Sequence, residues 1–379
     1  MKKFNIQFED LGADIEVSEF APKDKVAEYH AIIHIEPKGE IFPGQYSRIC
    51  KAEELLLQRP EISGSEIVFK RYFVSDSTNQ KPWIKDSDSP KVSLIQQPPL
   101  DGSKIALWLY LAKGMEISAQ HNCVTASHNG YTHIYKMGMQ STDGDSAAQT
   151  EKLLSDYEDA LSKFGATLAD NCIRTWFFVR DVDTQYAGMV KARRENFINQ
   201  GLTEKTHYIA STGIGGLPAE TKALVQLGTY ALKGHETSQV KYLYAPEYLN
   251  PTYEYGVTFE RGTCVEFGDR AEIYISGTAS IDNKGNVLYI GDIKRQTERM
   301  IENVNALLKE ADSGFNDVAQ IIVYLRDIAD YQTVKEIFDK RFPDIPRVIT
   351  LAPVCRPTWL IEMECVAVAE RKNEGLKDW

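Results

Sequence analysis

The chain has 379 residues, of which 43% are hydrophobic and 26% are charged, so it has the balance of a globular protein and the length for two or three domains. Its formal net charge of −11 argues against nonspecific binding to nucleic acid, which needs a basic face for the phosphates. No segment approaches the roughly 18 consecutive apolar residues that a membrane span needs, which argues against a membrane protein.

The N-terminal segment and the cysteines indicate the compartment. Residues 1–10 contain no apolar stretch of the kind found in secretion signals. The six cysteines form no Cys-X-X-Cys pair, so we expect reduced thiols rather than a disulfide framework. A soluble cytoplasmic protein is the prediction.

The first third of the chain predicts one α+β unit of irregular pattern. A short helical signal at residues 53–58 precedes a β-rich run at residues 66–76, and a second β-rich run follows at residues 98–112. Between the two runs, residues 75–91 are rich in Ser, Asp, Pro and Lys, which is typical of a loop. We assign residues 1–120 to this degenerate unit, and no pattern within it indicates chemistry.

Three histidines follow, at positions 121, 128 and 133, with Cys123 among them. Together they allow a metal-binding interpretation, but their spacing fits no common zinc pattern. On a strand of alternating character, we expect surface or hydrogen-bonding histidines and no metal.

A longer pattern occurs twice in the remaining chain. Residues 149–181 and residues 296–327 each begin with Gln-Thr-Glu, continue with apolar residues at helical spacing, and end in a β-rich run closed by Arg-Asp. A second helical stretch follows each copy, at residues 186–197 and 331–342. We therefore predict a second unit at residues 121–255 and a third at 256–379. The fold class is α+β, with three tandem units, each a sheet with helices on one face, around a shared core.

The final strand of the third unit carries two acids that the corresponding stretches of the other units lack. Side chains alternate along a strand, so Glu362 and Glu364 share one face. Apolar sequence neighbours favour the protonated form of such a carboxyl, which suits a general acid. A solvated pair on an edge strand is the alternative. Fifteen residues earlier, Arg347 could hold a substrate carboxylate, although a surface ion pair is equally compatible with spacing alone.

The sequence gives little support for nucleotide binding or for a Ser-His-Asp hydrolase. The segment Thr-Gly-Ile-Gly-Gly at residues 212–216 lacks the lysine of a phosphate-binding Walker loop. No histidine follows His235, so a Ser-His-Asp triad would need its base from an earlier unit.

From residue 266 to 371 the chain resembles the RidA/YjgF family. The resemblance rests on Ile-Ser-Gly-Thr-Ala-Ser at 275–280, Gly291-Asp292, Gln296-Thr-Glu, Val-Tyr-Leu-Arg-Asp at 323–327, Pro-Arg347 and Ile-Glu-Met-Glu at 361–364. In that family the residue matching Arg347 holds a substrate carboxylate, and the one matching Glu362 activates water. Such units commonly form trimers, so three units in one chain imply an internal pseudo-trimer, either as a monomer or within a homo-oligomer.

A longer resemblance, over residues 170–370, is to the chorismatase family. It rests on the following motifs: Asn-Cys-Ile-Arg-Thr-Trp-Phe-Phe-Val at 171–179, Tyr186 with Arg193 and Phe197, Ser-Thr-Gly-Ile-Gly-Gly at 211–216, Thr-Phe-Glu-Arg-Gly-Thr at 258–263, and Val-Cys-Arg-Pro-Thr-Trp-Leu-Ile-Glu at 354–362. These enzymes cleave the enol ether of chorismate to pyruvate and a cyclohexadiene or hydroxybenzoate acid, without metal or organic cofactor.

The resemblance implies a role for each candidate. Glu362 would protonate the methylene carbon of the enol ether, and Arg193, Arg261 and Arg347 would bind carboxylates. Cys355 would line the ring pocket. Apart from the resemblance, the tyrosine-rich segment at residues 242–255 could line the same pocket or pack in the core, and we select Tyr255 because it is nearest to Phe259 and Arg261. Two other functions stay open: RidA-type deamination of 2-imino or enamino acids, and noncatalytic binding of a small carboxylate.

Overall fold

The computed structural model describes residues 1–379, apart from the side chain of Tyr255, and contains three mixed sheets. The first sheet has the following strand order: β1 (Lys2–Phe8), β2 (Ala13–Phe20), β3 (Ala27–Ile35), β6 (Ile105–Lys113), β4 (Glu66–Val74), β5 (Val92–Gln96) and β12 (Leu217–Pro218). Its helices are α1 (Phe42–Leu57) and the short α2 (Ser77–Gln80).

The second sheet runs in the order β11 (Ala210–Gly215), β10 (Cys172–Val179), β13 (Val225–Lys233), β9 (Tyr131–Gln140), β8 (Cys123–His128) and β7 (Glu116–Gln120). Its helices are α3 (Ser146–Ser162), α4 (Leu168–Asn171) and α5 (Val182–Asn199).

The third sheet runs in the order β14 (Val240–Leu243), β15 (Gly262–Glu266), β16 (Arg270–Ala279), β19 (Ile361–Glu370), β17 (Val318–Leu325) and β18 (Arg347–Leu351). Its helices are α6 (Ile293–Glu310) and α7 (Tyr331–Arg341).

The three sheets repeat one topology, which confirms the prediction of tandem α+β units. In each, the last long strand of the unit lies in the middle, between an antiparallel partner on either side, and a parallel pair follows on one side. This pair forms the edge of the second and third sheets, whereas β12 extends the first sheet beyond it. The parallel pairs are β4–β5, β10–β11 and β17–β18. The first unit differs from the other two, because only the four-residue α2 lies where they carry α5 or α7.

Local sequence explains where the helices α3 and α6 begin. Asp145 caps α3 by accepting a hydrogen bond from the backbone of Ala148, and Asp292 caps α6 in the same way from Arg295. The apolar residues at helical spacing are buried against the sheets: Leu153, Leu154, Tyr157 and Leu161 in α3, and Met300, Val304, Leu307 and Leu308 in α6.

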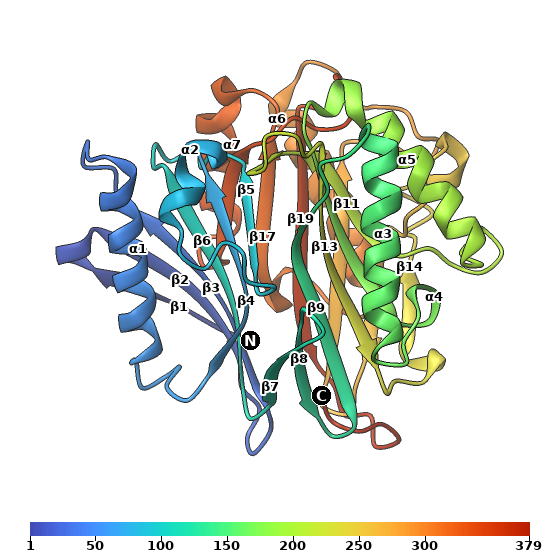
Figure 1. Ribbon diagram of the computed structural model, residues 1–379, viewed down its shortest axis with the longest axis horizontal. Coiled ribbons are helices and arrows are strands. Elements are labelled where there is room, and N and C mark those ends of the chain that lie inside the picture. The colour runs from blue at the N-terminus through green and yellow to red at the C-terminus, as the bar shows by residue number, and fades with distance from the viewer.

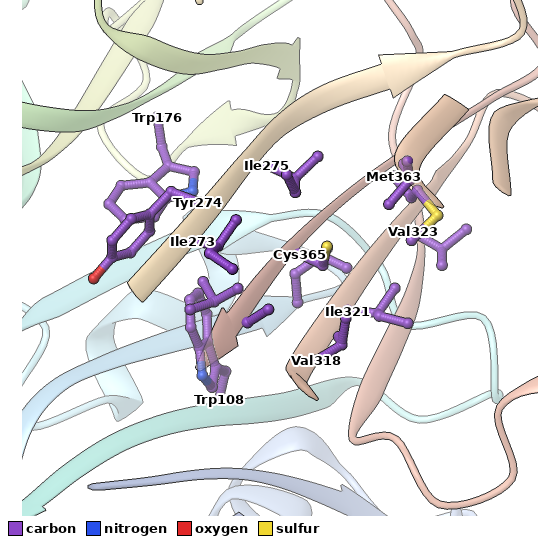
Figure 2. Close-up of a cluster of buried hydrophobic side chains, with 14 of the residues drawn as sticks. Trp108, Trp176, Ile273, Tyr274, Ile275, Val318, Ile321, Val323, Met363 and Cys365 are labelled. Carbon is purple, nitrogen blue, oxygen red and sulfur yellow. The ribbon is translucent and has the colours of Figure 1, made fainter. Parts of the chain in front are cut away.

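The sheets meet at a common centre with helices on the outside. Figure 1 places α1 on one flank, α3 and α5 on the other, and the strands β17 and β19 between them. Figure 2 shows part of the central core, where Trp108 of β6, Trp176 of β10 and Cys365 of β19 lie close together, so all three units contribute to it. The expected shared core is therefore present. The burial of its apolar side chains is the main contribution that stabilises the fold.

The sheets divide the chain slightly earlier than the expected boundaries at 120 and 255. β7 pairs with β8 of the second sheet, and β14 pairs with β15 of the third. Each of these strands is the first strand of its sheet and lies at the sheet edge, so backbone pairing assigns it to the unit that follows. The expected boundaries were based on apolar periodicity, which is weak in edge strands. No helix of the described chain has the length and the apolar composition that crossing a membrane would require.

Candidate active site

One cavity lies between the second and third units and encloses about 540 Å³, including the solvent at its mouth. Among the described residues, none of those that line it belongs to the first unit. The lining residues are Tyr186, Arg193, Ser211, Gly213, Val257, Phe259, Arg261, Gly277, Ala279, Ile281, Cys355, Arg356, Trp359 and Glu362.

Glu362 lies at the start of the central strand β19 and pairs with Ala279 on one side and Tyr324 on the other. Only 5% of its surface is exposed, so the alternative of a solvated edge pair is wrong. Burial raises the pKa of the Glu362 carboxyl to about 8; the charge of Glu364 acts in the same direction and the nearby arginines oppose it. At neutral pH the carboxyl is therefore mostly protonated and can donate a proton.

Gly277 makes room for this carboxyl. The register between β16 and β19 shifts between Ile275 and Thr278, so the backbone bulges at Gly277. A Cβ atom at this position would collide with Oε1 of Glu362. Any larger residue would therefore displace the acid.

Two of the three predicted arginines line the pocket. Arg193 projects from α5, is almost fully buried, and has its Nη1 atom 3.4 Å from the hydroxyl of Ser211. Arg261, just before β15, donates from Nη2 to the carbonyl of Asn250 at 2.9 Å. A third guanidinium, that of Arg356, also lines the cavity and lies over the ring of Trp359. Sequence reasoning did not single out Arg356, although it belongs to the same motif as Cys355.

Arg347 is the exception, and its expected position beside Glu362 is wrong for this structure. Its guanidinium donates to Asp339 and, at 2.7 Å, to the carbonyl of Phe342, while its backbone N–H donates to Glu16 of the first unit at 2.7 Å. The side chain is therefore engaged outside the cavity.

The internal repeat explains this outcome. Arg347 pairs with Ile321 across β17–β18, and Ser211 pairs with Thr175 across β10–β11. Thr175 precedes Ile321 by 146 residues, the same separation as between Asp181 and Asp327, so Ser211 is the counterpart of Arg347. Each unit directs this position toward a different neighbour, and the residue that lines the pocket of Glu362 is Ser211.

The remaining two predicted site residues, Cys355 and Tyr255, were expected to shape the ring pocket. Cys355 lines the cavity, and burial followed by the adjacent Glu362 raises the pKa of its thiol to about 12, so it is uncharged. The side chain of Tyr255 lies outside the part of the chain that the structure describes. Its neighbours Val257 and Phe259 line the cavity.

Two of the three clustered histidines, His128 and His133, make hydrogen bonds. The Nδ1 atom of His128 lies 2.8 Å from the carbonyl of Trp379, and that of His133 lies 2.9 Å from the hydroxyl of Tyr230. Across the residues described, no cluster of three or more His, Cys, Asp or Glu side chains could hold a metal ion.

Part of the chain is similar in sequence to known proteins. The family model of Endoribonuclease L-PSP matches residues 266–369. A RutC family protein of Pyrococcus abyssi is 37% identical over 100 residues, which cover 26% of this chain and 79% of that protein. A 3-aminoacrylate deaminase, RutC of Acinetobacter baylyi, is 30% identical over 97 residues, which cover 25% of this chain and 77% of that protein.

Most of the chain resembles a solved chorismatase structure. The TM-score is 0.64 at 18% identity, and the match covers 82% of this chain and 95% of the chorismatase. At this identity the likeness establishes a common fold over most of the chain, whereas the family model matches residues 266–369. The chain therefore belongs, through its third unit, to the RutC family, and its fold is that of a chorismatase.

Proposed function

We propose that the protein hydrolyses the enol ether of chorismate, with Glu362 as the general acid. The observation that carries this proposal is the buried carboxyl of Glu362, whose pKa burial raises to about 8, in a cavity that is also lined by the guanidinium groups of Arg193, Arg261 and Arg356. Chorismate carries two carboxylates, and an acidic protein needs such a local group of cations to bind it. The chorismatase fold supports the same substrate.

The proposed reaction begins with proton transfer from Glu362 to the methylene carbon, where the electron pair of the double bond forms the new C–H bond. Water attacks the resulting oxocarbenium carbon and returns a proton to the Glu362 carboxylate. The hemiketal then breaks its bond to the ring oxygen, which takes up the hydroxyl proton. Pyruvate and a dihydroxycyclohexadiene carboxylate are the products.

Cys355 bears on the ring product. Its uncharged thiol lies on the wall of the cavity next to Glu362, and its position matches one that the chorismatase resemblance links to hydroxybenzoate formation. Subsequent loss of water from the ring would give that aromatic acid. We propose hydroxybenzoate as one of the products, released together with pyruvate.

Deamination of a 2-imino or enamino acid is the second candidate. A relative of the third unit is a 3-aminoacrylate deaminase, and the pocket offers an acid and several arginines to a small carboxylate. Against it stands the engagement of Arg347 with Asp339 and the first unit, because the family resemblance assigns substrate binding to that arginine. Noncatalytic binding of a carboxylate is the third, in which case chorismate raises the melting temperature without being consumed.

The cavity lies between two units of one chain, which supports a single chain as the functional unit. We propose a monomer, which light scattering tests directly: one chain per particle, with full activity, is expected, and activity confined to an oligomer would contradict it.

The test of the reaction is incubation with chorismate, with pyruvate followed through lactate dehydrogenase and the ring acids separated by chromatography. We expect pyruvate release from the natural protein and none above background from Glu362→Gln. Ammonia release from 2-aminoacrylate without pyruvate release from chorismate would favour the deaminase. No turnover of either substrate, with thermal stabilisation by chorismate, would favour a binding protein.

A further inference from the structure

Arg71 of the first unit reaches the centre of the molecule, although none of that unit's described residues lines the proposed active site. Its side chain is fully buried, and its guanidinium lies 5.0 Å from the ring centres of Trp108, Trp176 and Phe178. Among the described residues, its Nε and Nη2 atoms have no hydrogen-bond partner. Its Nη1 atom lies 3.4 Å from Glu364. A buried cation with so few hydrogen bonds depends strongly on its counter-charge.

Glu364 also accepts hydrogen bonds from three side chains of the second sheet. Arg174 of β10 donates to it from Nη2 at 2.7 Å, the indole N–H of Trp176 donates at 2.9 Å, and the hydroxyl of Thr212 on β11 donates to it too. The carboxylate is 1% exposed. Because Arg71 is in the first unit, Arg174 in the second and Glu364 in the third, this ion cluster joins all three units.

The same cluster holds the backbone that lines the cavity. The hydroxyl oxygen of Thr212 accepts a hydrogen bond of 2.9 Å from the backbone N–H of Gly277, the residue against which Glu362 lies. Arg174 also donates a hydrogen bond to the hydroxyl of Ser276. That hydroxyl oxygen accepts a hydrogen bond of 2.9 Å from the backbone N–H of Ser211. Loss of the carboxylate at 364 would therefore loosen both walls beside Glu362.

Charge provides a second connection. Glu362 and Glu364 are on the same face of β19, about 7 Å apart along the strand. In a buried site, a fixed negative charge at that distance favours the neutral form of a second carboxyl. The positive charge of Arg71 moderates the field of Glu364, so unit one influences a site that it does not line.

We propose that Glu364 and Arg71 are a positioning pair for the proposed acid Glu362: the charge of Glu364 keeps the proton on Glu362, the charge of Arg71 limits that effect, and Thr212 and Gly277 keep the carboxyl in place. This inference rests on the proposed role of Glu362 as an acid and holds for any substrate that needs one. The charged and titratable groups that face the two glutamates are Arg71 of β4, Arg174 of β10, Tyr186 and Arg193 of α5, Arg261 just before β15, Tyr324 of β17, and Cys355 and Arg356 of the loop before β19.

The experiment follows the ionisation of Glu362 directly, without a substrate. Full-length protein labelled with [δ-¹³C]glutamate is titrated by NMR, and the Glu362 signal is assigned by its loss in Glu362→Gln. Glu364→Gln should lower the Glu362 pKa by at least one unit, because a nearby negative charge is removed. Arg71→Met keeps the volume inside the aromatic cage and should raise that pKa, because a cation is removed. An unchanged pKa in either variant, or shifts of the same sign in both, overturns the proposal.

A matched control is the buried ion pair between Glu28 and Arg270, which joins the first and third units near the opposite end of β16. Glu28→Gln should lower the melting temperature without moving the Glu362 pKa, whereas a shift equal to that of Glu364→Gln would reduce the central cluster to a structural role. If Glu364→Gln does not fold, Arg71→Met alone decides, by the sign of its shift.

Activity adds a separate readout. Where chorismate is turned over, the alkaline limb of kcat/KM should move with the NMR value in each variant, toward lower pH in Glu364→Gln and toward higher pH in Arg71→Met. If chorismate is not turned over but the NMR shifts appear with the stated signs, the positioning pair stands and the proposed reaction falls.

Discussion

The interface between the second and third units and the one between the first and second units share a backbone but differ in chemistry. Glu362 pairs with Tyr324 at the first of these interfaces. Phe178 precedes Tyr324 by the repeat separation of 146 residues, and its strand partner Gln226 is therefore the counterpart of Glu362. Gln226 is fully buried, donates to the hydroxyl of Ser93 at 3.1 Å, and accepts from Gln140 at 2.7 Å. An amide satisfied in this way cannot serve as a proton donor to a substrate.

The cations differ between these interfaces as well. At the active interface, α5 supplies the buried Arg193. The first unit has only α2 at the corresponding place, and the described lining of the cavity there includes two lysines, Lys81 and Lys136, and no arginine. Lys81 is paired with Asp88 and Glu220. Among the described residues, a buried acid and arginines therefore line one cavity and not the other.

Glu362→Gln makes the active interface resemble its counterpart and should have the largest effect. The amide keeps the shape but cannot protonate carbon, so kcat should fall by about 10²- to 10⁴-fold. Steady-state pyruvate release measures it, with thermal unfolding as the check that the fold persists. Turnover within threefold of the natural protein would contradict the assigned acid.

Arg193→Met should have the next largest effect, because it removes one cation that distinguishes the two interfaces. Hydrogen bonds to charged groups contribute about 1.5–3 kcal/mol, so kcat/KM should fall by roughly 10- to 100-fold. Arg347→Met is the control, since that arginine is engaged with Asp339 and the first unit, and it should leave kcat/KM unchanged. Equal losses in both variants would mean that the cavity has been assigned to the wrong arginine.

The pH dependence sharpens the comparison further. The acid must be protonated, so kcat/KM should fall about tenfold per pH unit above the Glu362 pKa of about 8. The folded pKa lies above the unfolded value, so stability from this group is present below pH 4.5 and is lost as pH rises toward 8. Glu362→Gln should therefore unfold at a higher temperature than the natural protein at pH 9. A melting temperature equal to that of the natural protein at pH 9 would contradict the buried, neutral acid.

Gln226→Glu should have the smallest effect on activity. It places an acid at the counterpart interface, whose cavity has no arginine among its described lining residues, so a double variant with Glu362→Gln should regain no pyruvate release. Recovery of activity would show that the acid alone makes a site. The buried carboxyl is also expected to cost stability, because it replaces an amide with two hydrogen bonds, and thermal unfolding measures that loss.

Much of the fold was predictable because the repeat is visible in the sequence. Two copies begin with Gln-Thr-Glu and end with Arg-Asp, and this pattern predicted a helix and a strand in each. Acids that occur only in the third copy pointed to Glu362. Arg347 misled because spacing within one unit does not tell which neighbour a side chain faces. That depends on the pseudo-threefold arrangement, which directs Ser211 toward the cavity instead.

Arg71 and Arg356 were beyond prediction for different reasons. Arg71 lies in a strand whose apolar pattern gives no sign of a buried cation, and its partner Glu364 is 293 residues away. Arg356 belongs to a loop without regular periodicity, so only its place in the motif with Cys355 could have drawn attention to it. Contacts between units depend on packing, and the sequence of one unit does not encode which surface of another it meets.

The most direct test of the central claim is pyruvate release from chorismate by the natural protein and by Glu362→Gln in parallel, at pH 7. The account predicts steady release by the natural protein and a loss of at least 10²-fold in the variant, with both proteins folded. Release that is equal in the two proteins would contradict Glu362 as the acid, and no release from either would contradict chorismate as the substrate.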